Sequence, residues 1–159
     1  MLLIDHNFTF IMQEKIEYGK KACACAVSLD LLGDRWTLIL IRDLFRGRNK
    51  FSQFLNESSE GIASNTLVDR LKKLTALGII NFKRKESDKK VKEYYLTDKG
   101  IDLYPLIYEL QQWSIKHVDF EFKPGTEAFV DLTKQFSTPE VINEYQTSYK
   151  KARLEQFGF

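Results

Sequence analysis

The chain has 159 residues, of which 43% are hydrophobic and 29% are charged, so it can bury a real core and is not a disordered segment. Its two cysteines are too few for a disulfide scaffold, and it has no run of about 18 apolar residues that could cross a membrane. Because the net charge is only +2, any basic patch that attracts nucleic acid must be local.

The start of the chain lacks the basic and then apolar layout of a signal peptide, because Asp5, His6 and Asn7 interrupt it early. A reducing, cytoplasmic location without membrane association is therefore expected. Residues 1–22 are ambiguous, and we expect either an arm or a helix that packs on the body or on a partner chain. Four apolar residues would form the stripe of that helix: Phe8, Ile11, Met12 and Ile16.

Two helices are predicted next, at residues 26–32 and 35–45, and Gly33 interrupts the pattern between them. Asp34 is a good N-cap for the second helix, because a carboxylate there can accept a hydrogen bond from a first-turn N–H. The second helix is apolar nearly all round, which indicates that it is the core helix.

The most regular helical pattern covers residues 64–78. Its leucines recur at i, i+4 and i+7 and therefore share one face: Leu67, Leu71 and Leu74. Gly78 is expected to end the helix in a left-handed cap. Residues 50–55 predict one or two helical turns, and the spacing between the two segments fits a helix-turn-helix.

A basic β-hairpin is predicted directly after this helix. Residues 79–82 and 91–96 are β-prone, and Ser87–Asp88 is the expected turn between them. From Lys83 to Lys92 there are six Lys or Arg and two acidic residues, a local excess of +4. A helix with an open polar face followed by such a hairpin predicts a winged helix-turn-helix, whose helix lies in the major groove while the wing follows phosphates.

A long helix is predicted for residues 98–120, capped by Thr97–Asp98 and kinked at Pro105. Its apolar stripe needs more cover than the winged unit offers, which favours burial in a homodimer interface. That stripe consists of Leu103, Leu106, Ile107, Leu110 and Trp113.

Residues 121–159 are expected to form a helical C-terminal extension. Pro124–Gly125 predicts a turn or boundary, and a short helix is expected at residues 126–136. Thr138 and Pro139 suit the N-cap and first position of a final helix that reaches about Gln156.

Six motifs in order resemble the HxlR-type transcriptional regulators, a winged-helix branch close to the MarR proteins. They are Cys23 followed by residues 29–36, and then residues 51–54, 61–63, 71–74, 78–80 and 94–100. The resemblance implies a dimeric DNA-binding regulator with dimer contacts from N-terminal and C-terminal helices, and it assigns residues 23–120 to that domain. Ala63 departs from the family's usual Ser, so the N-cap falls to a neighbour such as Ser64 or is lost. The tail beyond Phe120 exceeds the family's compact domain.

The candidate DNA contacts lie on the polar face of the predicted recognition helix and on the hairpin. On the helix they are Ser64, Asn65, Thr66, Asp69, Arg70 and Lys73. On the hairpin they are Lys83, Arg84, Lys85, Lys89 and Lys90. Asn and Arg can contact base edges with two hydrogen bonds, whereas Asp69 is expected to orient Arg70 or Lys73. The alternative is an ordinary solvated helix face and a solubilising hairpin tip.

The resemblance places Cys23 at the family's redox-sensing position, where Lys20, Lys21 and a helix N-terminus would favour the thiolate. The alternative is a small buried apolar residue. Cys25 follows too closely for an unstrained bridge to Cys23, so a link between subunits is favoured if oxidation matters.

No metal site, cofactor or enzymatic activity is expected. Only His6 and His117 could complete a metal site with the two cysteines, and neither is near in sequence. The chain has no Gly-rich phosphate loop, no His-Glu-x-x-His and no Gly-x-Ser-x-Gly motif.

The sequence therefore predicts a mainly α fold with a small β-hairpin wing (α+β), a winged helix-turn-helix with dimerising N- and C-terminal helices. The expected function is a sequence-specific transcriptional regulator, a homodimer that binds a pseudo-palindromic operator in double-stranded DNA. An oxidant or a small-molecule effector would act by shifting the two recognition helices relative to each other. The alternatives are a winged-helix protein-interaction module that no longer binds DNA, and an enzyme.

Overall fold

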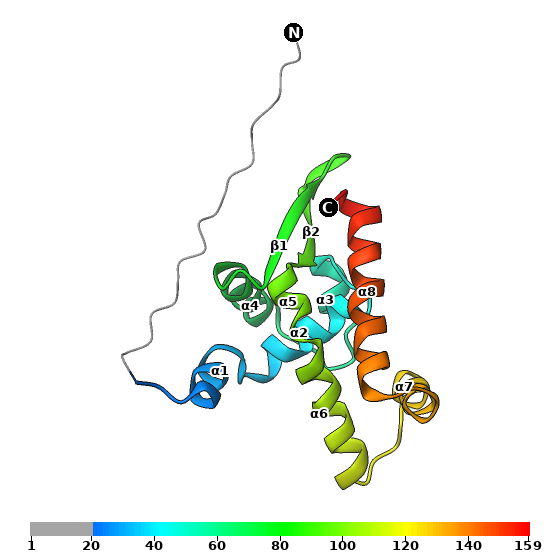
Figure 1. Cartoon of the computed structure of the whole chain (residues 1–159). Coiled ribbons are helices and arrows are strands. Elements are labelled where there is room, and N and C mark those ends of the chain that lie inside the picture. The colour runs from blue at the N-terminus through cyan, green and yellow to red at the C-terminus, as the bar shows by residue number, and fades with distance from the viewer. Residues whose placement is uncertain (1–20) are drawn as a thin grey trace.

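The computed structural model describes residues 21–159, so the interpretation of residues 1–20 as an arm or helix lies outside the described residues. The elements in order are α1 (Ala24–Leu32), α2 (Arg35–Phe45), α3 (Phe51–Asn56), α4 (Ser64–Ala76), β1 (Ile80–Lys85), β2 (Asp88–Leu96), α5 (Asp98–Ile101), α6 (Tyr104–His117), α7 (Pro124–Gln135) and α8 (Thr138–Phe157). Helices gather around the base of one protruding hairpin (Figure 1), which confirms the predicted fold class. Within residues 21–159, no helix combines the length and apolar character needed to span a bilayer.

Helix α2 forms the centre of the core, as predicted. It begins at Asp34, whose Oδ1 accepts a hydrogen bond of 3.0 Å from the Thr37 N–H. Leu40, Ile41 and Leu44 are at most 1% exposed. Helix α2 contacts α4, α6 and β2, so these elements all pack around it.

Helix α4 packs its predicted leucine face into this core. Leu67, Leu71 and Leu74 are buried, and the helix is followed by Gly78 at φ +66°, the left-handed conformation expected after a helix end. At its start Ala63 supplies no side-chain cap, so the usual N-cap bond is lost. The side chain of Asn65 accepts from the Thr66 N–H at 2.9 Å and satisfies one donor of this first turn.

The hairpin is longer than predicted. Its strands pair from Ile80 opposite Leu96 to Lys85 opposite Asp88, and the turn lies at Glu86 and Ser87, one residue earlier than expected. The charged residues that we assigned to the tip are therefore mostly strand. Two of the charged pairs across the strands carry opposite charges and favour pairing, Lys83 with Glu93 and Lys85 with Asp88, whereas Arg84 lies opposite Lys92.

A close backbone approach fixes the base of the hairpin. Thr97 caps α5 as predicted, and its hydroxyl also donates to the Gly78 carbonyl at 2.6 Å. A Cβ on Gly100 would lie 2.2 Å from the Ile79 carbonyl oxygen, so only glycine fits there.

The prediction of one kinked helix over residues 98–120 is wrong. The chain breaks after Ile101, and Pro105 lies in the first turn of α6. Proline is favoured there because the N–H that it lacks has no partner within the helix. The same reason corrects the predicted turn at Pro124–Gly125, which instead begins α7.

The C-terminal extension forms two helices that pack on the family-like domain. Ser137, rather than the predicted Thr138, caps α8 and forms a capping box with Glu140. A second apolar cluster joins α6 to the extension through Tyr104, Tyr108 and Phe129. The side of α6 that carries Tyr104 and Tyr108 is thus covered within the same chain.

Helix α8 continues from α7 to the hairpin (Figure 1) and holds its base. The Leu96 N–H donates to the Tyr149 hydroxyl at 2.9 Å, and Arg153 donates to the Leu96 carbonyl at 2.9 Å. The ring of Phe157 lies 4.9 Å from that of Tyr95. The extension therefore supports the wing directly.

Candidate nucleic-acid interface

Both surfaces that the sequence predicts for DNA contact are accessible. On α4, Ser64, Asn65 and Asp69 are exposed, whereas Thr66, Arg70 and Lys73 are partly exposed. All the predicted hairpin positions are exposed as well: Lys83, Arg84, Lys85, Lys89 and Lys90.

An ion-pair cluster holds two of the α4 cations. Arg70 Nε lies 2.7 Å from Asp34 Oδ1, and Lys73 Nζ lies 3.2 Å from Asp34 Oδ2. Partial burial alone would raise the pKa of Asp34, but hydrogen bonds from Thr37, Arg70 and Lys73 hold that pKa well below its usual range. The carboxylate that orients these cations is therefore Asp34, and the expectation that Asp69 does so is wrong.

The basic hairpin residues fall into two groups. Lys83 donates to the Phe157 carbonyl at 2.9 Å, and Arg84 donates to the Lys89 carbonyl at 2.8 Å, so both brace the hairpin. The ammonium groups of Lys85, Lys89 and Lys90 make no ion pair or hydrogen bond within residues 21–159. Of the five predicted hairpin cations, these three therefore remain available for phosphates.

A hollow of about 470 Å³ separates α4 from the hairpin. Two lysines that we did not single out line it, Lys72 on α4 and Lys92 on β2. Lys92 Nζ lies 4.1 Å from the centre of the Phe82 ring. Their basic character was visible in the sequence, but their convergence on one hollow depends on the packing of α4 against the hairpin.

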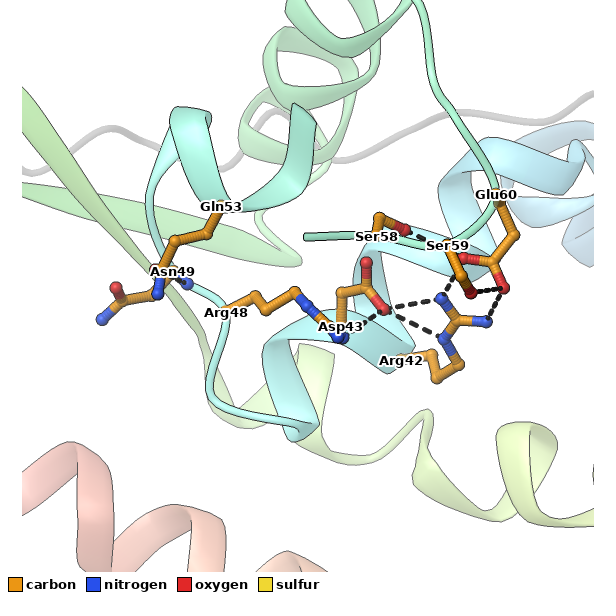
Figure 2. Close-up of polar contacts among 8 residues, drawn as sticks. All are labelled: Arg42, Asp43, Arg48, Asn49, Gln53, Ser58, Ser59 and Glu60. Carbon is orange, nitrogen blue, oxygen red and sulfur yellow. Dashed lines mark hydrogen bonds and ion pairs between the residues drawn. The ribbon is translucent and has the colours of Figure 1, made fainter. Parts of the chain in front are cut away.

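A second ion-pair cluster fixes the loop that leads into α4 (Figure 2). Arg42 donates to both carboxylate oxygens of Glu60 at 2.8 and 2.7 Å, and also to Asp43 at 3.0 and 2.7 Å. The hydroxyls of Ser58 and Ser59 donate to Glu60 as well. Because Arg42 belongs to α2 and Glu60 to the loop, these bonds set where α4 begins.

Asp43 is fully buried and would be costly to hold without cations. Its Oδ1 accepts from Arg42 and from Arg48, the latter at 3.2 Å. The adjacent turn is closed by Gln53, whose side-chain oxygen accepts from the Asn49 N–H at 3.1 Å (Figure 2). The turn between α2 and α3 and the loop before α4 thus share one polar cluster.

Both cysteines are exposed, so the alternative of a buried apolar residue is wrong for Cys23. Cys23 is the N-cap residue of α1, and hydrogen bonds from the backbone of Ala26 and Cys25 lower the pKa of its thiol. This direction agrees with the predicted thiolate. No group of three His, Cys, Asp or Glu residues in the described part of the chain could hold a metal ion, and His6 lies outside that part.

Residues 31–122 match the HxlR-like helix-turn-helix family. The chain is 37% identical over 91 residues to the HTH-type transcriptional regulator MT3179 of Mycobacterium tuberculosis. The aligned region covers 57% of this chain and 56% of MT3179, so this chain matches only a little over half of that relative. It is 31% identical over 98 residues to the HTH-type transcriptional regulator YvaP of Bacillus subtilis, covering 60% of this chain and 87% of YvaP.

Solved structures show the same similarity. The oxidised redox regulator HypR is 27% identical with a TM-score of 0.55, covering 62% of this chain and 100% of HypR. The reduced transcriptional regulator YodB of B. subtilis is 29% identical with a TM-score of 0.51, covering 62% of this chain and 97% of YodB. Both matches leave more than a third of the present chain uncovered.

Replacing Glu60 by Gln should reduce the loss of stability in acid. Hydrogen bonds from Arg42 lower the pKa of Glu60 below its ordinary value of 4.5, so the unfolded chain takes up a proton at higher pH than the folded chain. This contribution is fully present above pH 4.5 and is lost as the pH falls from there toward the folded-state pKa. Urea unfolding at a series of pH values down to about 3 measures the difference.

Glu155→Gln, on an exposed side of α8, is the matched control and should retain the acid sensitivity of the unmodified protein. An equal pH dependence in Glu60→Gln and Glu155→Gln would show that the Arg42 bridge does not stabilise the fold.

Proposed function

The chain belongs to the HxlR-like helix-turn-helix family, and from this premise we propose that it acts as a homodimer on a pseudo-palindromic DNA operator. The observation that carries the proposal is the accessible polar face of α4 beside a hairpin with three lysines that are unpaired within residues 21–159. In a two-fold dimer the two α4 helices would enter successive major grooves, so the half-sites would lie one DNA turn or a multiple apart.

The contacts divide by chemistry. Ser64, Asn65 and Thr66 at the start of α4 would read base edges, because short polar side chains there can reach into the major groove. Arg70 and Lys73, held by Asp34, would contact bases or phosphates from a fixed position. Asp69 would avoid the phosphates.

The hairpin would contribute affinity rather than sequence specificity. Lys85, Lys89 and Lys90 would neutralise phosphates, whereas Lys83 and Arg84 would keep the hairpin in place.

Reversing the charge of Lys89 and Lys90 to Glu should weaken binding to every duplex sequence. For each phosphate that is no longer neutralised, the slope of log affinity against log salt should also fall in magnitude by about 0.9. Fluorescence anisotropy with operator and random duplexes at several salt concentrations measures both effects.

The matched control is the double charge reversal of Lys123, the N-cap residue of α7, and Lys134, in its last turn; α7 lies at the far end from the hairpin (Figure 1). If the two double variants bind DNA with equally reduced affinity, the wing has no specific role. If the unmodified protein shows no salt-dependent duplex binding, the protein-interaction alternative replaces the proposal.

The exposed apolar residues favour dimerisation through α6 and α1. Leu106, Leu110 and Trp113 are 40, 46 and 62% exposed along α6, and Leu29 of α1 is 62% exposed. Within the described part of the chain α1 has no buried residue, so residues 33–159 give it little cover. A second copy that covers both helices would bury this surface.

Trp113→Lys should weaken the dimer, because a large exposed aromatic residue at such an interface often contributes much of the association energy. Sedimentation equilibrium should show a dissociation constant raised at least about tenfold. Leu154→Lys, at a residue 57% exposed on α8, should leave it unchanged. A monomeric unmodified protein, or equal dimers in both variants, would exclude this interface.

We also propose that Cys23 responds to oxidants. Two similar structures are the redox regulator HypR in its oxidised form and the transcriptional regulator YodB in its reduced form. In the present chain the Cys23 thiol is exposed, and its pKa is lowered. An exposed cysteine at the N-cap of α1, a helix proposed to lie in the dimer surface, could form a disulfide between subunits.

Diamide should change operator affinity in the unmodified protein but not in Cys23→Ser, whereas Cys25→Ser should respond like the unmodified protein. A non-reducing gel tests whether a band of doubled mass accompanies the change. Equal responses of the unmodified protein and Cys23→Ser would exclude a role for this thiol.

A further inference from the structure

A pocket of about 600 Å³ lies where the C-terminal extension meets the family-matched domain. Its lining includes Arg42 and Phe45 of α2, Tyr104 of α6, Phe129 of α7 and Tyr145 of α8. The volume lies within the range of small-molecule sites. Because the family match ends at residue 122, six of the fifteen residues that line the pocket belong to a part of the chain that the family similarity does not explain.

The pocket is positively charged. Among the described residues that line it, Glu60 is the only acidic one and four are basic: Arg42, Arg46, Arg48 and Lys123. Arg42 and Arg48 are paired with Asp43 or Glu60. A ligand anion would therefore have to bind the remaining two cations.

The side chains of Arg46 and Lys123 make no hydrogen bond or ion pair within the described range, residues 21–159. Partial burial and the neighbouring Arg42 and Arg48 lower the pKa of Arg46, although an arginine stays protonated at neutral pH. The side chains of Arg46 and Lys123 are both exposed, so solvent reaches them and a dissolved anion can as well.

Part of the lining is aromatic. The rings of Tyr104 and Tyr145 stack at a centroid distance of 4.5 Å and an interplanar angle of 14°, and Phe45 meets Tyr104 edge-on at 4.8 Å. Burial and the adjacent Tyr145 raise the pKa of Tyr104, whose side chain is only 2% exposed. Flat apolar groups pack well against such a lining.

We propose that this pocket binds a small aromatic carboxylate, with the carboxylate on Arg46 and Lys123 and the ring against the partly exposed Phe45 and Tyr145. A guanidinium presents two parallel N–H groups to a carboxylate, which gives the anion a fixed orientation. Binding of the ligand does not depend on the proposed function. An effect of the ligand on DNA binding rests on the proposed regulator function.

The pocket touches the supports of both DNA-facing surfaces. Arg42 holds Glu60 in the loop before α4, and Tyr145 lies one turn before Tyr149, which accepts from the Leu96 N–H at the base of the hairpin. A ligand that binds differently to two positions of α8 would therefore shift the wing relative to α4.

The test uses the full chain without DNA, so that its outcome is independent of the proposed DNA binding. Isothermal calorimetry with 2-naphthoate should show one saturable site per chain, and neutral 2-naphthamide should bind at least about tenfold more weakly. Arg46→Gln should weaken 2-naphthoate about tenfold or more, because it removes a cation that has no partner within residues 21–159 and so breaks no existing bond there.

Two further variants separate charge from space. Lys151→Gln makes the same charge change at an exposed position of α8 outside the pocket and should leave binding unchanged. Ala128→Trp, at an exposed lining residue, should block the pocket without changing the charge. Unchanged binding in Arg46→Gln or Ala128→Trp, equal affinity for the amide, or no saturable binding at millimolar 2-naphthoate would each overturn the proposal.

Discussion

The arrangement of the DNA-facing elements depends on how ion pairs anchor α4 to the two ends of α2. Near one end, Arg42 bridges Asp43 to Glu60 and so ties the core helix to the loop before α4. At the other end, Asp34 caps α2 and pairs with Arg70 and Lys73 of α4 itself. Apolar burial supplies most of the free energy of packing but is not directional, whereas these charged hydrogen bonds fix the rotation and position of the helix.

The C-terminal extension has two structural effects. It covers Tyr104 and Tyr108 of α6, and it supports the hairpin through α8. The apolar residues of α6 that stay exposed are Leu106, Leu110 and Trp113. A second copy would thus meet a helix that its own chain has already fixed in place.

The sequence predicted elements well wherever one local pattern decided them. The leucine repeat of α4, the Asp34 cap and the Thr97 cap are all contained within a few residues, and all are confirmed. Two errors arose at prolines, Pro105 and Pro124, because proline can either interrupt a helix or begin one. The hairpin was predicted too short because apolar patterning cannot detect strands that are solvated on both sides.

By itself the sequence determined the winged helix-turn-helix, the basic hairpin and the polar face of α4, because periodicity and net charge are properties of neighbouring residues. Only the tertiary structure decided that Asp34 pairs with Arg70, 36 residues away, and that Lys83 is bound by the end of α8. The tertiary structure also places Arg46 beside the C-terminal extension, and both line the same pocket. Contacts of this kind depend on helix packing and on the direction of each side chain, which a linear pattern does not contain.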